Sequence, residues 1–191
     1  AIDGREQAPA AATRDMFLRQ GTADTRLSQS GALAAGVPGA LAAYAPAVGH
    51  YGKLPLATHL VAAARYAEEG VVIDRTYAQR LAATAGELRQ FEAARAIFLN
   101  PNGAPFYAGD LLKQPDLART YRAISDQGIH WFYQGPFAVA TAAWMKLNGG
   151  LITAGDFKGY QIKLRDPVRT TYRGHEILGF PPPSSGGVHV G

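Results

Sequence analysis

One arginine near the start of the 191-residue sequence stands where it could bind a substrate. Arg5 follows Asp3 and Gly4 and precedes Glu6, in a short segment that ends at Pro9. A guanidinium presents a rigid fork of donors, which matches a carboxylate through two parallel hydrogen bonds. An arginine next to a glutamate also commonly forms a surface ion pair. From the residues alone, both uses of Arg5 stay open.

Glu6 is the acidic neighbour of Arg5. In an extended segment, successive side chains point to opposite faces. We therefore expect Glu6 to brace nearby backbone or a basic partner, and we leave it out of the candidate site.

A second candidate lies near the other end, where Ser184 and Ser185 stand between three prolines and Gly186-Gly187. Proline fixes φ and removes a backbone donor, so the chain must run extended there, whereas Ser-Ser-Gly-Gly allows a turn and a helix start. A nucleophile elbow needs Gly-x-Ser-x-Gly, which neither serine satisfies. A phosphate loop would need further glycines and a lysine. We predict a tight turn and the start of a helix.

The sequence predicts no metal site and no organic cofactor. It has no cysteine, and no two of its five histidines stand at a helical metal-ligand spacing. The histidines are His50, His59, His130, His175 and His189. An aromatic group predicts packing of a helix rather than a cofactor site. It comprises Trp131, Phe132, Tyr133, Phe137 and Trp144.

The composition is typical of a globular protein. With 47% hydrophobic residues the chain could bury a sizeable core, and we expect residues 1–191 to be a single-domain segment. The 19 Lys and Arg against 15 Asp and Glu are scattered, without a run of like charge, so a nucleic-acid partner is not expected. No apolar run is long enough to span a bilayer, and the first residues do not resemble a signal peptide.

The elements that must position these side chains are mostly helices between Gly and Pro residues. The pattern predicts helices over residues 10–18, from residue 40 with a bend at Pro46, from Leu56 to Gly70, after an Asp74 cap, from Pro115 to Gly128, over residues 135–147 and over residues 156–160. Strands are predicted over residues 27–35, from residue 161 and over residues 172–180, residues 3–9 are expected to be extended, and residues 100–110 form a turn-rich link.

Ordered short motifs along the chain resemble the large subunit of the γ-glutamyltransferase family. The two end segments carry most of the resemblance, namely Asp3-Gly4-Arg5-Glu6-Gln7-Ala8-Pro9 and the Pro181-Pro182-Pro183-Ser184-Ser185-Gly186-Gly187 run. Between them lie Ala11-Thr13-Arg14-Asp15-Met16-Phe17, Ala35-Gly36-Val37-Pro38-Gly39, Tyr51-Gly52-Lys53-Leu54-Pro55, Asn148-Gly149-Gly150-Leu151-Ile152-Thr153 and Tyr172-Arg173-Gly174-His175. A single Gly-Gly or Pro-Pro would be weak evidence of a resemblance, but the ordered set of motifs spans the whole chain and is strong evidence.

The resemblance implies an α+β fold. The segment would supply outer helices and some strands of the αββα four-layer sandwich of N-terminal nucleophile (Ntn) hydrolases. It implies that an N-terminal section and a small catalytic subunit from the same precursor lie outside residues 1–191. It further implies export, to the periplasm or outside the cell.

The resemblance also implies a reaction and a role for Arg5. In the family, a precursor cuts itself before a threonine, which then carries the γ-glutamyl group of glutathione to water or to an amino acid or peptide. Arg5 matches the arginine that holds the α-carboxylate of the donor. The nucleophile opens a Thr-Thr-His-Tyr-like stretch that is absent here. We interpret Thr170-Thr171-Tyr172 as a structural strand, so no catalytic residue is expected in this chain and the segment alone is predicted to be inactive.

Two alternatives stay open. A related Ntn-hydrolase acylase, of the cephalosporin, glutaryl or poly-γ-glutamate type, would keep the fold and change the substrate. A non-catalytic fragment that folds alone would keep neither the reaction nor the partner.

Overall fold

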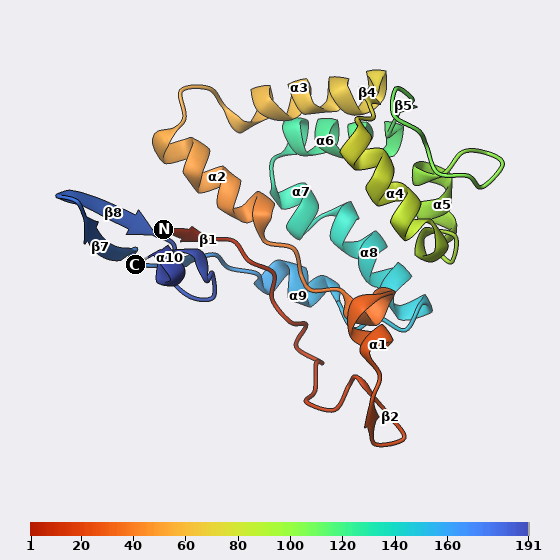
Figure 1. The fold of residues 1–191 in the computed structure, drawn as a ribbon, viewed down its shortest axis with the longest axis horizontal. Helices are drawn as coiled ribbons and strands as arrows, with labels where there is room; N and C mark the ends of the chain where they lie inside the picture. The colour runs from red at the N-terminus through yellow and green to blue at the C-terminus, as the bar shows by residue number, and fades with distance from the viewer. Residues whose placement is uncertain (191) are drawn as a thin grey trace. The chain divides into compact units, whose positions relative to one another are not determined.

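The computed structural model describes residues 1–190 as a mixture of helices and very short strands (Figure 1). The chain divides into two compact units, one made of Ala1–Lys53 with Ile129–Gly191 and the other of Leu54–Gly128. Compact units within one chain can belong to one larger domain. The single-domain assignment over residues 1–191 therefore stays a prediction.

The first unit contains short helices and three of the two-stranded ladders. Its helices are α1 (Thr25–Gln29), the 3-10 turn η1 (Ala32–Ala34), α2 (Ala40–Tyr51), α7 (His130–Tyr133), α8 (Pro136–Leu147), α9 (Ala154–Gly159) and α10 (Gly186–Val190). Its strands are β1 (Ile2–Asp3), β2 (Leu18–Arg19), β3 (Thr22–Ala23), β6 (Lys163–Leu164), β7 (Val168–Tyr172) and β8 (His175–Gly179).

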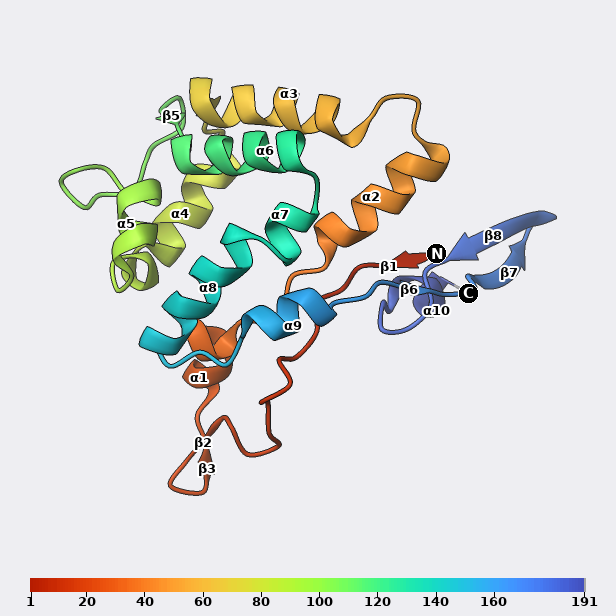
Figure 2. The same cartoon turned by 180° about the vertical axis from the view of Figure 1, so that it is seen from behind.

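Antiparallel pairing joins the two ends of the first unit. β1 pairs with β6 in a register that places Ile2 opposite Leu164 and Asp3 opposite Lys163. The other two ladders, β2 with β3 and β7 with β8, are local hairpins. The β1–β6 ladder is therefore the long-range pairing that brings the start of the chain to the segment after α9, as the neighbouring labels in Figure 2 show.

Aromatic packing forms the core of the first unit. Phe132 stacks on Phe137 at a ring-centroid distance of 4.1 Å, and Phe157, which is almost fully buried, contacts both rings edge-on. Tyr133 stacks on Tyr160 at 5.8 Å. The prediction that the aromatic group packs a helix is confirmed for Phe132, Tyr133 and Phe137.

The second unit is a helical layer closed by a small ladder. It contains α3 (Leu56–Glu69), β4 (Val71–Val72), α4 (Arg75–Leu88), α5 (Glu92–Phe98), β5 (Leu111–Leu112) and α6 (Pro115–Gln127). α3 and α6 lie side by side in both ribbon views and bury Ala64, Ala67 and Ala118, small residues that let two helices approach closely (Figures 1 and 2).

Proline, glycine and one capping aspartate explain most of the helix boundaries. α3 starts after Pro55 and ends before Gly70, α4 is capped by Asp74, and α6 and α8 carry proline in their first turns. These predicted helices are confirmed, as is a short one at α9. Pro46 lies inside α2 without shortening it, because the helix continues to Tyr51.

Two predictions for residues 10–35 are wrong. Residues 10–18 form successive turns instead of a helix, since the following Gln20 and Gly21 take positive φ and fold β2 back on β3. Residues 27–35 form the end of α1 and η1 instead of a strand. The Asp24 carboxylate caps α1, and alanine favours a helical turn over a strand.

The C-terminal strand prediction also needs a correction. Residues 172–180 are not one run, because Arg173 and Gly174 take positive φ and form a tight turn between β7 and β8. Tyr172 therefore ends one strand and His175 begins the next. α5 was not expected at all, and no N-capping side chain marks its start.

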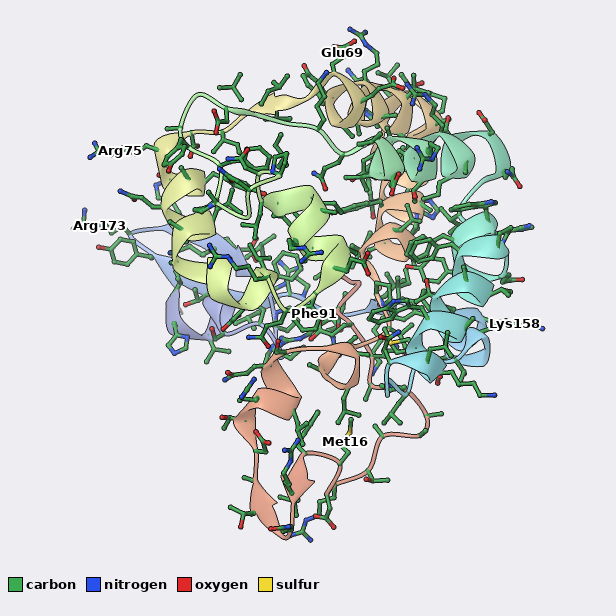
Figure 3. The ribbon with its side chains drawn as sticks, turned by 90° about the vertical axis from the view of Figure 1, so that its right-hand side faces the viewer. Met16, Glu69, Arg75, Phe91, Lys158 and Arg173 are labelled. Carbon is green, nitrogen blue, oxygen red and sulfur yellow. The ribbon has the colours of Figure 1, made fainter. Side chains whose placement is uncertain are left out.

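Charged side chains lie on the outside of both units. In Figure 3, Glu69, Arg75, Lys158 and Arg173 point away from the ribbon, and all four are exposed. Over residues 1–190, no helix combines the length and apolar character needed to cross a bilayer.

Candidate functional site

Arg5 leaves β1 through a short turn that its own neighbours build. The Arg5 backbone N–H donates to Asp3 Oδ1 at 3.0 Å, a turn in which an aspartate binds the amide two residues on. Gly4 lies between them, and a Cβ there would stand 2.5 Å from the Ala43 Cβ. Glycine therefore lets this turn lie against α2.

A buried tyrosine holds the next peptide group, on the other side of the Arg5 Cα. Tyr160 Oη donates to the Arg5 carbonyl at 2.7 Å. The Tyr160 ring stacks on Tyr133, whose hydroxyl donates to the Pro38 carbonyl at 2.9 Å. Burial, with the nearby Asp3 and Glu6 carboxylates, raises the pKa of Tyr160, so its hydroxyl stays protonated and remains a donor at neutral pH.

The Arg5 side chain reaches the proline run. Its Nη1 donates to the Pro183 carbonyl at 3.3 Å, and its Nε donates to Glu6 Oε1 at 3.2 Å. The Arg5 and Glu6 side chains are both more than half exposed. Within residues 1–190 no hydrogen bond uses Nη2, which leaves that nitrogen free to meet an anionic ligand.

The Arg5–Glu6 contact corrects the expectation that Glu6 points to the opposite face. Residues 4–6 lie outside the strands, so strand alternation does not govern their side chains. The Glu6 backbone N–H and the Arg5 side chain lower the pKa of Glu6. Glu6 thus binds a basic partner, as the sequence predicted, and that partner is Arg5.

Asp3 links Arg5 to a second arginine. While Asp3 Oδ1 accepts from the Arg5 amide, Oδ2 accepts from Arg165 Nε at 2.7 Å. The Arg5 backbone N–H, followed by the Arg165 side chain, lowers the pKa of Asp3 below its usual value. Asp3 is therefore ionised at neutral pH and can hold both partners.

Two small hollows, of about 200 and 130 Å³, border these side chains. They share Asp3, Arg5, Arg165 and Pro183. Phe180 and Ser184 belong to the first hollow only, and Tyr160, Gln161 and Lys163 to the second only. The lining contains three cationic side chains and only two carboxylates, those of Asp3 and Glu6, so the region is suited to a small anionic group. The cations are Arg5, Lys163 and Arg165.

Ser184 and Ser185 form a turn and the start of a helix. The Ser184 N–H donates to the Pro181 carbonyl at 3.1 Å, and the Ser185 carbonyl accepts from Val188 and His189 at the start of α10. The predicted turn and helix start are confirmed. Gly187 is essential there, because a Cβ would lie 2.2 Å from the Phe180 carbonyl oxygen.

Thr170, Thr171 and Tyr172 lie in β7, which confirms their structural interpretation. Over residues 1–190 no group of three or more His, Asp or Glu side chains could hold a metal ion.

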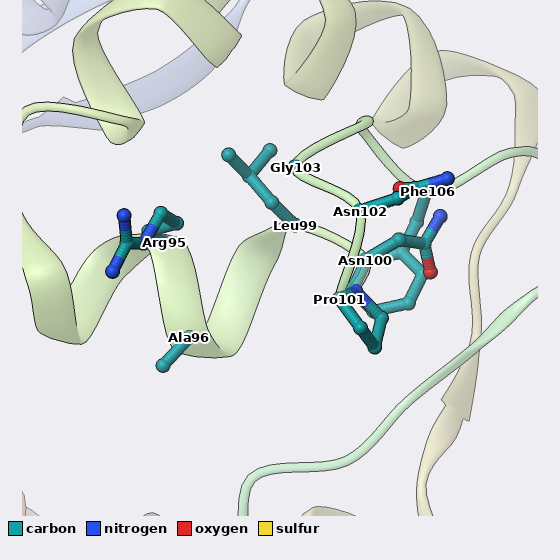
Figure 4. A pocket seen from close by; sticks show the side chains of 8 residues that line it. All are labelled: Arg95, Ala96, Leu99, Asn100, Pro101, Asn102, Gly103 and Phe106. Carbon is teal, nitrogen blue, oxygen red and sulfur yellow. The ribbon is translucent and has the colours of Figure 1, made fainter.

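A larger hollow, of about 640 Å³, lies within the second unit between α5 and residues 100–106 (Figure 4). It is lined by Arg95, Ala96, Leu99, Asn100, Pro101, Asn102, Gly103 and Phe106. These residues include one guanidinium and two amides but no acid, base or nucleophile. The Arg5 region, where residues from both ends of the chain converge, is therefore the stronger candidate.

Sequence reasoning found Arg5 but missed three residues that hold it. Asp3 could have been found from its spacing, since an aspartate two residues before an amide is a known turn signal. Tyr160 contacts Arg5 directly from 155 residues away in the sequence. Arg165 contacts Asp3, which is 162 residues away and in turn binds the Arg5 amide. No local pattern gives such contacts.

Comparison with known proteins places this geometry in a family. The family model described as gamma-glutamyltranspeptidase matches residues 1–191, the whole chain. The chain belongs to this family. The γ-glutamyltransferase resemblance drawn from the motifs is thereby confirmed.

Individual relatives agree with the family assignment. The chain is 41% identical over its full length to the glutathione hydrolase proenzyme of Escherichia coli K12, covering 33% of that protein. It is 38% identical to the acylase ACY 1 proenzyme of Pseudomonas sp. SE83, with 99% of this chain and 35% of that protein covered. The chain therefore spans about a third of the length of the curated relatives it matches.

A solved structure supports the fold. The crystal structure of Helicobacter pylori gamma-glutamyltranspeptidase matches with a TM-score of 0.94 at 38% identity, over 99% of this chain and 54% of that one. The segment is thus a mixed α+β part of the fold that γ-glutamyltranspeptidases share.

Proposed function

We propose that this chain is a large-subunit segment of an enzyme that takes the γ-glutamyl group from glutathione or a related γ-glutamyl compound. The group would pass through a threonine ester to water, or to an amino acid or peptide acceptor. The threonine would belong to a small subunit released from the same precursor. Such a reaction needs no metal or organic cofactor.

The observation that carries this proposal is the presentation of Arg5. Its backbone N–H is held by Asp3 and its carbonyl by Tyr160. Its side chain reaches Pro183 and lines two hollows of about 200 and 130 Å³. The family match covers both segments that meet there. A guanidinium held this way is suited to the α-carboxylate of a γ-glutamyl donor.

We propose that the full-length protein completes the αββα sandwich of Ntn hydrolases. Within the described residues, β7 and β8 pair only with each other, so each has an outer edge that further strands could extend. The family resemblance also supports a periplasmic or secreted location. Fractionation of cells that express the full-length protein tests that location.

Replacing Arg5 in the full-length, matured protein tests the proposed role. Arg5→Ala should raise KM for a γ-glutamyl anilide roughly 10- to 100-fold, because charge-assisted hydrogen bonds to the donor are lost. Arg14→Ala is the matched control, since the Arg14 side chain is almost fully exposed and only reaches Asp15 at 4.0 Å. An unchanged KM in Arg5→Ala would remove Arg5 from the site.

An acylase is the second candidate function, since an acylase proenzyme is almost as similar to this chain as a glutathione hydrolase proenzyme is. Substrate preference distinguishes the two candidate functions. A higher kcat/KM for glutaryl than for γ-glutamyl substrates in the full-length protein would establish the acylase and reject the proposal above.

A further inference from the structure

We propose that Tyr160 and Arg165 are positioning residues that fix the place of the Arg5 guanidinium. Tyr160 acts on the Arg5 peptide directly, and Arg165 acts through Asp3. The inference rests on the proposed role of Arg5 in binding the donor carboxylate, and it adds the residues that make this role geometrically possible.

Tyr160 connects the aromatic core to Arg5. Its ring is buried and stacked on Tyr133, so the core fixes the direction of its hydroxyl, which lies 2.7 Å from the Arg5 carbonyl oxygen. Gly39 leaves room for that hydroxyl, because a Cβ at Gly39 would stand 1.8 Å from Tyr160 Oη. The backbone of Arg5 is thus tied to the buried aromatic core of its unit.

Arg165 acts, through Asp3, on the peptide group that precedes the Arg5 Cα. In the β1–β6 ladder Asp3 lies opposite Lys163, and Arg165 is the diagonal neighbour within reach of a long side chain. The Asp3 side chain is only 15% exposed and that of Arg165 33%, so this pair is better shielded than the Arg5–Glu6 pair. With its carboxylate held by Arg165, Asp3 keeps its other oxygen on the Arg5 amide.

Both contacts matter because two-point recognition of a carboxylate depends on orientation. A guanidinium that shifts or turns loses one of its two parallel hydrogen bonds while keeping its charge. We therefore expect the positioning residues to affect binding of the donor carboxylate and not the later acyl-transfer chemistry.

The test uses the full-length, matured protein and two donors. One is a γ-glutamyl anilide, and the other is 4-aminobutanoyl anilide, which keeps the amino group and lacks the α-carboxylate. Tyr160→Phe and Arg165→Gln should each raise KM for the first donor about 2- to 10-fold, with kcat nearly unchanged. Kinetics on the second donor should not change.

Matched controls come from the same chain. Tyr44→Phe alters an exposed tyrosine, and Arg169→Gln removes an exposed cross-strand pair with Glu176. Neither should change KM for either donor. Arg165→Lys, which restores the positive charge, should recover part of the loss in Arg165→Gln.

Several results would overturn the inference. Equal losses on both donors, or a fall in kcat alone, would mean that these residues act through general packing or chemistry. Losses that add fully to that of Arg5→Lys would mean direct contact with the donor. A Tyr160→Phe protein that fails to release its small subunit would assign Tyr160 to folding. Asp3→Asn then tests the Arg165 link independently, and an unchanged KM in that variant rejects it.

The same assay separates this inference from the proposed function. If Arg5→Ala raises KM for the γ-glutamyl donor and the two positioning variants do not, only the inference fails. If Arg5→Ala itself leaves KM unchanged, the proposed function of Arg5 fails first.

Discussion

At the scale of single residues, close backbone approach at glycine decides what the site can look like. Gly39 has φ −115° and ψ −10°, which any residue can adopt, so its importance is steric and not conformational. The space that its missing Cβ leaves is filled by the Tyr160 hydroxyl. The sequence shows the glycine within a family motif, but it does not show which distant side chain uses the space.

Gly39→Ala should therefore destabilise the full-length protein by about 1–3 kcal/mol, because overpacking must push Tyr160 or α2 aside. Gly49→Ala is the control, and it should change the free energy of unfolding in the opposite direction. Gly49 lies inside α2 with open space around it, so alanine should stabilise the protein by roughly 0.5–1 kcal/mol. Chemical denaturation of both variants measures the difference, and equal effects would contradict the steric explanation.

The Asp3 carboxylate should make part of the stability depend on pH. Its pKa is lowered in the folded state, so its contribution is fully present above the unfolded value of about 3.9 and is lost as the pH falls through the lower folded value. The stability difference between the wild type and Asp3→Asn should thus be largest at neutral pH and shrink below about pH 4. A difference that stays constant down to about pH 3 would show that Asp3 gains nothing from its ionised partners.

At the scale of elements, most helices were predictable, whereas the ends and the pairing of the strands were not. Proline in the first turn, glycine after the last and an aspartate cap are local signals, which is why α3, α4, α6 and α8 were found. The strand predicted from residue 161 is confirmed by β6, but β1 and β6 are each only two residues long and pair across the chain, so no local pattern gives their ends or their pairing. The positive φ of Gln20 and Arg173 was also not predicted, since residues other than glycine rarely take that conformation.

The cap of α4 offers a prediction at this scale. Asp74 Oδ1 accepts from the Tyr77 amide at 2.7 Å, so Asp74→Ala should cost about 1 kcal/mol in the free energy of unfolding. Asp74→Asn should cost much less, because asparagine caps a helix nearly as well. A hydrogen-exchange measurement should locate the loss at the start of α4, and protection that is unchanged there would rule out the cap.

At the scale of the whole molecule, two apolar helices pack on the core but leave other apolar side chains exposed within residues 1–190. α2 has no buried residue although it is almost entirely apolar, and Tyr44 and Tyr51 are exposed on it. On α8, Val139, Trp144 and Leu147 are exposed. Helices that are apolar all round are normally buried, so these surfaces fit contact with other parts of a full-length protein.

The isolated 191-residue chain should therefore self-associate and should not turn over a γ-glutamyl anilide. Light scattering and binding of a hydrophobic dye test the first expectation, and a rate measured against buffer tests the second. The full-length protein provides the comparison for both. A monomeric isolated chain that unfolds cooperatively would favour the non-catalytic fragment, and turnover by it would disprove the assignment of the nucleophile to a partner subunit.

The Asp3–Arg165 ion pair has a consequence for protein synthesis. Its two residues are 162 positions apart, and a ribosome adding 5–20 residues per second needs roughly 8–30 s to make the intervening chain. During that time the second unit, which consists of 75 consecutive residues, can already fold on the nascent chain. Arg5 emerges among the first residues described here, yet its surroundings are completed among the last.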